Sequence, residues 1–498
     1  MQNRIGFDNE KYLKMQSENI RQRIAQFGGK LYLEFGGKLF DDYHAARVLP
    51  GFQPDSKVKM LLEMKEEAEV LLVISADDIE RSKRRGDLGI TYDEDALRLI
   101  DAFREIGLYV SSVVITHYQG QNAAELFQKR LETLGIRTCR HYIIPNYPAD
   151  IPLIVSDAGY GKNDYVETSR SLIVVTAPGP GSGKMAVCLS QLYHEHKRGV
   201  SAGYAKFETF PIWNLPLKHP VNLAYEAATA DLNDVNMIDP YHLEAYHVTA
   251  VNYNRDVEVF PVLNAILERI RGAGNTPYHS PTDMGVNLVG DCIIDDEVCC
   301  AASRQEIIRR WYAAACALRQ GLGTQEEMRK IETIMRSAGI TTDERPTVAA
   351  ALKRAEETGE PAMAIQLCDG RIITGKTSSL LGAASACLLN ALKALGDISR
   401  RTRLISPNII EPIQHLKVEH LGGHNPRLHT DETLEALSIC AVTNPMAEVA
   451  MEQLSALRGA EAHASVILSR VDESLFHKLG VNVTCEPRYQ VTKLYHKS

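Results

Sequence analysis

The stretch 171–184, SLIVVTAPGPGSGK, joins an apolar run to a loop of glycines and prolines that ends on a lysine. Residues 172–176 are apolar and mostly β-branched, which predicts a buried strand, and residues 185–196 have the composition of a helix. A glycine-rich turn between a strand and a helix can hold phosphate, because backbone N–H groups, the positive helix end and a lysine converge there. We therefore expect an α/β fold with a phosphate-binding, P-loop-like turn.

The turn departs from the usual phosphate-loop pattern at two positions. Pro178 stands where the pattern has glycine, and Met185 stands where it has serine or threonine. Proline lacks an N–H group and methionine lacks a hydroxyl for Mg²⁺, so one phosphate group is held more securely than a triphosphate. The expected phosphate contacts are Gly179, Gly181, Ser182, Gly183 and Lys184. The alternative is a strand-to-helix turn that binds nothing.

On both sides of this turn, from residue 31 to about residue 210, β-rich runs alternate with amphipathic helices. The alternation predicts a doubly wound, mostly parallel, Rossmann-like sheet. The expected strands are 31–35, 70–75, 109–117, 138–144, 152–155, 172–176 and 200–205. The expected helices are 57–67, 93–106, 123–134 and 185–196. Ligands in such sheets bind beyond the carboxyl ends of strands, where Asp77, Asp78, His117 and the turn would lie.

The composition of the chain predicts three segments. Residues 1–210 form the Rossmann-like domain with the phosphate-binding loop, and residues 211–338 form an irregular segment and helical bridge that complete the site. Residues 339–498 form a smaller C-terminal α/β domain with a β-hairpin at 363–375 and a helix at 378–395. This opening resembles the cytidine-deaminase-like fold, but the zinc-binding elements of that fold are absent, so only the architecture is expected.

A second candidate phosphate-loop motif, GRIITGKT at residues 370–377, matches the usual phosphate-loop spacing better than the turn at residues 179–184 does. Its context argues against nucleotide binding. Asp369-Gly370 is a hairpin-turn dipeptide, and residues 371–374 favour an extended strand, which cannot wrap a phosphate. We expect a plain hairpin there.

Charge and hydropathy exclude several classes of protein. The 498 residues carry a net charge of −8, which argues against general nucleic-acid binding. No apolar stretch reaches the length of a membrane span, and the start of the chain is polar, so we expect a cytoplasmic protein. Ten cysteines without paired spacing favour reduced thiols.

An acidic, turn-rich cluster follows in the central segment. Asp231 and Asp234 lie close to Asp239 and His242 in ADLNDVNMIDPYH. Because phosphoryl transfer needs carboxylates to hold Mg²⁺, we expect Asp231 and Asp234 to act as metal ligands and, with Lys184, as the catalytic set. The alternative assigns these aspartates to turns and helix caps.

Two further glycine-rich loops carry lysines. Lys162 lies in SDAGYGKNDYVET just before the expected phosphate-loop strand, and Gly37 and Lys38 end the first expected strand. These residues could supply further contacts to an anionic ligand. Tight turns and solvated loops are the alternatives.

Histidines in EHLGGHNPRLHTDE suggest a different site. His420, His424 and His429, with Asp431, could bind a metal or an anionic substrate. Solvated or supporting histidines are the more common outcome.

The phrases FGGKLFDDYHAARVLPGF, GYGKNDYVETSR, APGPGSGK, KFETFPIWNLPLKHPVN, YHSPTDMGVN and CDGRIITGK together resemble a conserved bacterial family of unknown function. Some members carry the label ATP-dependent zinc protease. The resemblance covers nearly the whole chain and implies a two-part α/β cytosolic protein that forms homo-oligomers. No His-Glu-x-x-His pair is present, so zinc is not favoured.

These observations lead to one main hypothesis and two alternatives. We expect an enzyme that binds a nucleotide such as ATP, or a phosphorylated metabolite, with Mg²⁺ as a candidate cofactor, and that performs phosphoryl transfer or a related phosphate-dependent step. One alternative is a metal-dependent hydrolase that uses the C-terminal histidine loop. The other is a non-catalytic oligomeric sensor of a phosphorylated metabolite.

Overall fold

The computed structural model describes residues 4–37, 39–40, 42–85, 89–272 and 274–490. Contacts divide the chain into two compact units. The first, which we call the sheet unit, consists of Ile5–Glu226 and Asn233–Ala302. The second, the C-terminal unit, is built mainly from the chain after Ala302 and includes the short segment Ala227–Leu232.

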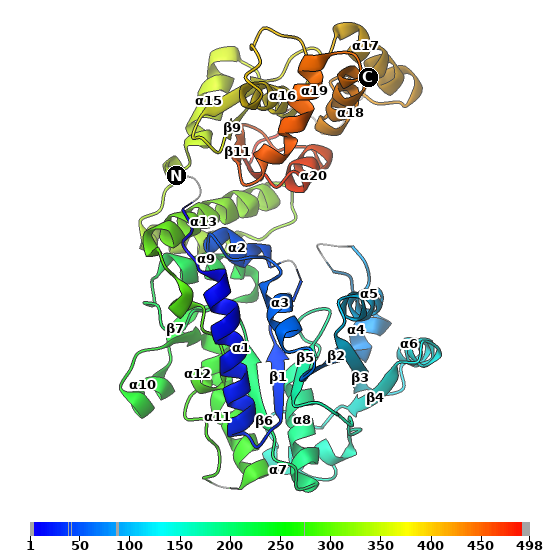
Figure 1. Ribbon diagram of the computed structural model, residues 1–498, viewed down its shortest axis with the longest axis vertical. Helices are drawn as coiled ribbons and strands as arrows, with labels where there is room; N and C mark the ends of the chain where they lie inside the picture. Colours follow the sequence, from blue (N-terminus) through cyan, green and yellow to red (C-terminus); the bar gives the residue numbers. More distant parts are fainter. Residues whose placement is uncertain (1–3, 38, 41, 86–88, 273, 491–498) are drawn as a thin grey trace. The chain divides into compact units, whose positions relative to one another are not determined.

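A six-stranded parallel sheet forms the centre of the sheet unit, with strand order β4-β3-β2-β5-β1-β6 (Figure 1). The strands are β1 (Leu31–Phe35), β2 (Ala68–Ser75), β3 (Tyr109–Tyr118), β4 (Arg137–Tyr142), β5 (Leu172–Thr176) and β6 (Gly203–Phe207). Every residue of β1, β2 and β5 is buried, as expected for strands covered on both faces. The predicted α/β class with a parallel sheet is confirmed.

The chain winds outward from the middle of this sheet in both directions. From β2 it steps to β3 and β4, whereas from β5 it crosses over β1 to reach β6. Because such crossovers are right-handed, the two directions place their helices on opposite faces. The helices α4 (Ala76–Glu80) and α5 (Tyr92–Glu105) pack against β2 and β3, and α8 (Lys184–Lys197) packs against β1, β5 and β6. The winding reverses at β5, which is where open α/β sheets bind ligands.

The other elements of the sheet unit surround this frame. They are α1 (Asn9–Gln26), α2 (Tyr43–Val48), α3 (Ser56–Glu63), α6 (Asn122–Thr133), α7 (Ile151–Ile154), η1 (Tyr160–Lys162), β7 (Asn236–Ile238), α10 (Pro240–Tyr246), β8 (Val251–Tyr253), α11 (Asn254–Arg271), α12 (Pro281–Met284) and η3 (Gly290–Cys292). The helices α9 (Pro220–Ala228) and α13 (Asp296–Arg319) each contribute residues to both units.

Two of the expected strands differ from the structure. Of the strand expected at 152–155, residues 152–154 lie in the short helix α7, because Asp150 caps its start by accepting from the Leu153 N–H and Pro152 suits the first turn. The last strand of the sheet is β6, which begins three residues later than expected, at Gly203. An added Cβ at Gly203 would overlap the Phe27 ring.

The C-terminal unit contains a mixed four-stranded sheet of order β10-β9-β11-β12. Its strands are β9 (Ala362–Gln366), β10 (Ile372–Lys376), β11 (Glu461–Ala464) and β12 (Asn482–Cys485), and only β11 and β12 pair in parallel. Its other elements are η2 (Ala230–Leu232), α14 (Gln325–Ala338), η4 (Thr342–Glu344), α15 (Pro346–Thr358), α16 (Ala383–Leu395), α17 (Pro407–His415), η5 (Leu416–His420), α18 (Thr430–Ala441), α19 (Pro445–Glu452), η6 (Gln453–Leu457) and α20 (Arg470–Lys478).

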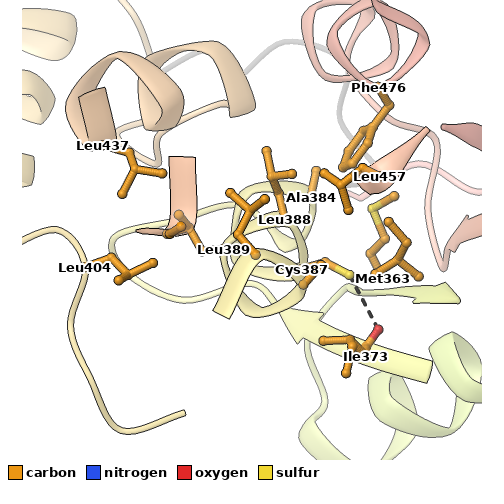
Figure 2. Packing of buried hydrophobic residues seen from close by; sticks show 14 of the residues in the cluster. Met363, Ile373, Ala384, Cys387, Leu388, Leu389, Leu404, Leu437, Leu457 and Phe476 are labelled. Carbon is orange, nitrogen blue, oxygen red and sulfur yellow. Dashed lines mark hydrogen bonds between the residues drawn. The ribbon is translucent and has the colours of Figure 1, made fainter. Parts of the chain in front are cut away.

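The hydrophobic core of this unit surrounds α16. Figure 2 shows Leu388 and Cys387 of α16 among buried side chains from the hairpin and from later helices. The Cys387 thiol donates to the Ile373 carbonyl oxygen at 3.6 Å. The helix is therefore fixed directly onto β10.

The hairpin prediction at residues 363–375 is confirmed. Gly370 has φ 88° in the turn, and the residues that follow it form the extended strand β10. Gly375 packs so closely on α16 that an added Cβ would overlap the backbone of Cys387. This glycine of the second phosphate-loop motif, GRIITGKT, therefore allows the strand to pack closely against the helix.

None of the helices among the described residues combines the length and the apolar character that a membrane crossing requires.

Candidate functional site

The turn that follows β5 depends on its glycines. Gly181 and Gly183 have φ values of 77° and 88°, in the left-handed region, and Gly183 is the N-cap of α8. Gly179 packs against the phenol of Tyr92, where an added Cβ would overlap the ring. Thr116 at the end of β3 donates its hydroxyl to the Ser182 carbonyl oxygen at 2.6 Å. These contacts fix the backbone of the turn between a strand end and a helix start.

The N–H groups of this turn remain available. Among the described residues, no acceptor hydrogen bonds to the N–H groups of Gly181, Gly183 or Lys184, and no carboxylate pairs with the Lys184 ammonium. The Ser182 side chain is only 2% exposed, and its hydroxyl has no partner there either. The helix α8 adds its positive N-terminal dipole at the same place. The turn thus offers unused donors and an unpaired cation to an anion.

His117 of β3 lies beside Thr116, the residue that contacts the turn. It directly follows Thr116, has φ 51°, and its Nδ1 lies 3.2 Å from the Ser75 hydroxyl at the end of β2. Asp77 approaches the same imidazole at 3.9 Å. The residues expected beyond the carboxyl ends of β2 and β3 are therefore close to one another, and Thr116 links them to the turn.

A cavity lies at the carboxyl end of β6. Its atom-free space measures about 630 Å³, including its open mouth. Its lining contains Met185, the residue after Lys184, together with Tyr204, Lys206 and Glu208 of β6 and its extension. The segments 210–213, 251–263 and 281–287 complete the wall. The start of α8 thus contributes both to the turn and to this cavity.

A network of charged side chains forms the polar side of the cavity. The Lys206 ammonium lies 2.7 and 2.8 Å from the two carboxylate oxygens of Asp256 and 3.2 Å from Glu208. Arg255 reaches Glu208 at 3.5 Å and Asp234 at 3.2 Å. Burial raises the pKa of Glu208 despite the nearby Lys206 ammonium. Burial alone would lower the pKa of Lys206, but the two carboxylates raise it.

Sequence reasoning did not identify this network. Lys206 and Glu208 are two positions apart, which places both side chains on one side of a strand end, and this spacing was the available signal. Asp256 comes from the start of α11, some fifty residues later, so its approach to Lys206 depends on the tertiary fold.

The other predicted anion contacts lie in different places. Gly37 follows β1, the neighbour of β5, and Lys38 lies outside the described residues. The Lys162 ammonium stands 4.9 Å from the centre of the Tyr142 ring, at the end of β4. Its segment η1 packs against α8, the helix that the turn opens.

Both predicted Mg²⁺ ligands lie among the described residues. Asp231 is exposed in η2, which groups with the C-terminal unit, whereas Asp234 is buried in the sheet unit beside Arg255. Their neighbour Asp239 caps α10, accepting from the N–H groups of Tyr241 and His242. For Asp239 the capping alternative is therefore confirmed.

The C-terminal histidines do not converge. His420 and His424 are exposed, and His429 caps α18 with its Nδ1 3.0 Å from Asp472. Among the described residues, none of these histidines belongs to a group of three side chains whose metal-type ligand atoms lie within 4.8 Å of one another, and His429 takes the N-cap position of α18.

One such cluster exists among the described residues, formed by His219, Asp296 and Cys300. His219 Nε2 lies 3.0 Å from Asp296, and Val221 donates its N–H to His219 Nδ1 at 3.3 Å. Because Nδ1 accepts, the proton resides on Nε2 and is donated to Asp296. A metal on Nε2 would displace that proton, so the geometry describes a hydrogen-bonded group.

Comparisons with known proteins cover almost the whole chain. Residues 5–339 match the family model "Domain of unknown function DUF1846, N-terminal", and residues 343–495 match "Domain of unknown function DUF1846, C-terminal". A UPF0371 protein of Streptococcus pyogenes serotype M5 (strain Manfredo) is 57% identical over 493 residues, 99% of each chain. A UPF0371 protein of Streptococcus equi subsp. equi (strain 4047) is 57% identical over 491 residues, again 99% of each. The expected resemblance to a conserved bacterial family is confirmed.

Proposed function

We propose that this chain, which belongs to the DUF1846 family, binds the phosphate group of a small metabolite at residues 179–184 and performs a phosphate-dependent reaction there. The observation that carries the proposal is that the N–H groups of Gly181, Gly183 and Lys184, and the Lys184 ammonium beside them, have no partner among the residues that the structure describes. Main-chain donors at a helix N-terminus, together with a lysine, are the usual means of binding phosphate.

The proposal favours one phosphate group over a clamped triphosphate. Pro178 and Pro180 have no N–H groups, and Met185 offers no hydroxyl to a metal. Of the two carboxylates expected to hold Mg²⁺, Asp234 already pairs with Arg255 at 3.2 Å. In this proposal, Lys184 and the main-chain donors neutralise the phosphate charge without those aspartates.

Calorimetric titration with inorganic phosphate, ATP and GTP tests the proposal. We expect saturable binding of phosphate, and the Lys184→Ala variant should bind it at least about tenfold more weakly, since it loses a charge-assisted contact. Lys197→Ala is the matched control. This variant removes a lysine from the opposite end of the same helix, where it pairs with Asp157 at 2.9 Å, and should retain wild-type affinity.

Equal affinity of wild type and Lys184→Ala for all three ligands would exclude this site. Measurement of substrate turnover distinguishes a phosphate-dependent enzyme from a non-catalytic sensor. An enzyme consumes its phosphorylated substrate in a Lys184-dependent way, whereas a sensor binds tightly and leaves a broad panel of phosphorylated metabolites unchanged.

A further inference from the structure

We propose that the cavity at the end of β6 binds an organic ammonium or guanidinium group on a small molecule with an apolar body. This inference rests on the proposed function, because Met185 borders the cavity and directly follows Lys184. The substrate class is then a cationic amine that carries the phosphate held at residues 179–184.

The side-chain donors that line the cavity are already used within the protein. Lys206 spends its ammonium protons on Asp256 and Glu208. Trp213 Nε1 donates to the Asn287 carbonyl oxygen at 3.0 Å, and Asn287 Nδ2 donates to the Thr209 carbonyl oxygen at 2.7 Å.

The hydroxyl groups that line the cavity also donate to acceptors within the protein. Tyr204 donates to Glu34 at 2.7 Å, and Thr282 donates to Asp239 at 2.6 Å. A ligand therefore finds few free donors on these side chains, and it must bring donors of its own.

Acceptors and negative charge remain in excess. Each carboxylate offers about four lone-pair sites, more than the contacts of Glu208 and Asp256 occupy. The charged side chains that line the cavity are two carboxylates, Glu208 and Asp256, and one cation, Lys206. A cationic donor group would balance this surplus in a half-buried site, where charge pairing is stronger than in water.

The opposite wall of the cavity is apolar. It includes Met185, Trp213, Val259, Leu263 and Met284. Such a wall suits an aliphatic or aromatic body and contributes nothing to a bare metal ion. Lys206 also bonds both oxygens of Asp256, so a metal would first have to displace its ammonium. We therefore assign the cavity to an organic cation.

Tryptophan fluorescence measures this binding directly. The chain has two tryptophans, and Trp311→Phe leaves Trp213 in the cavity wall as the only one. Titration of this full-length variant uses three probes of one shape: benzylamine, benzyl alcohol and benzoate. We expect benzylamine to change the Trp213 emission saturably and to bind at least about tenfold more tightly than benzyl alcohol, with no saturation by benzoate.

Two substitutions locate the effect. Glu208→Gln should weaken benzylamine at least about tenfold, whereas Glu258→Gln, which changes an exposed glutamate on α11, should not. Lys184→Ala should leave benzylamine binding intact while phosphate binding is lost, so failure of this inference is distinguishable from failure of the proposed function. Equal affinity for benzylamine and benzyl alcohol, or displacement of benzylamine by Mg²⁺ at equal concentration, would overturn the assignment.

Discussion

Lys184 and Lys206 both lie near strand ends of the same sheet, but their charges are used differently. Lys206 is held by Asp256 and Glu208, so its ammonium stabilises a network inside the protein. Lys184 pairs with no carboxylate of the described chain and stands beside unused main-chain donors. At the scale of single residues, a charged side chain without an ion-pair partner is the more informative sign of ligand binding, because such a cation gains most from an added anion.

The pair of His429 and Asp472 predicts a pH-dependent stability. The hydrogen bond to Asp472 raises the pKa of His429. Burial acts to raise the pKa of Asp472, but bonds from His429, the Thr430 N–H and Ser469 lower it overall. The stabilisation from His429 is therefore complete below the unfolded pKa of about 6.5 and is lost as pH rises through the higher folded pKa, while that from Asp472 is lost in acid.

We expect His429→Asn to cost about 1–2 kcal/mol of unfolding free energy near pH 5.5 and clearly less near pH 8.5. Asparagine is itself a favourable N-cap residue, so the change isolates the ion pair. Urea unfolding at both pH values measures the effect, with His424→Asn on an exposed neighbour as control. A cost that is the same at both pH values would contradict this account.

At the scale of elements, the hairpin of the C-terminal unit shows that the helices and strands around a sequence motif indicate the role of that motif. The spelling GRIITGKT fits a phosphate loop, but its residues run along β10, and Gly375 faces the backbone of α16. By contrast, APGPGSGK follows a strand and opens a helix. The element that contains a glycine decides its role, and the sequence context was sufficient to distinguish the two cases.

Gly375→Ala should therefore destabilise the protein by about 2–4 kcal/mol, since its Cβ would overlap the main chain of Cys387, which cannot rotate away. Chemical denaturation measures this loss. Lys376→Ala, the next residue with an exposed side chain, should change stability by less than about 0.5 kcal/mol. Equal stability of the two variants would show that the contact between β10 and α16 is looser than described.

At the scale of the whole molecule, the parallel sheet and its winding were predictable because strand and helix periods alternate along the chain. The start of the chain was harder. Its polar composition concealed α1, whose buried stripe includes only Tyr12, Ile20 and Ile24 among larger apolar residues. The turn at residues 179–184 could be located from sequence, whereas the cavity could not, because Met185, Lys206 and Asp256 come from separate segments that only the fold brings together.

Selective ¹⁵N labelling of glycine tests the central claim across all 34 glycines of the chain. Titration with inorganic phosphate should move the amide signals of Gly181 and Gly183 saturably, and Lys184→Ala should abolish the change, while glycines of the C-terminal unit such as Gly370 stay in place. If the signals of Gly181 and Gly183 do not move at saturating phosphate, or move equally in the Lys184→Ala protein, this turn does not bind phosphate.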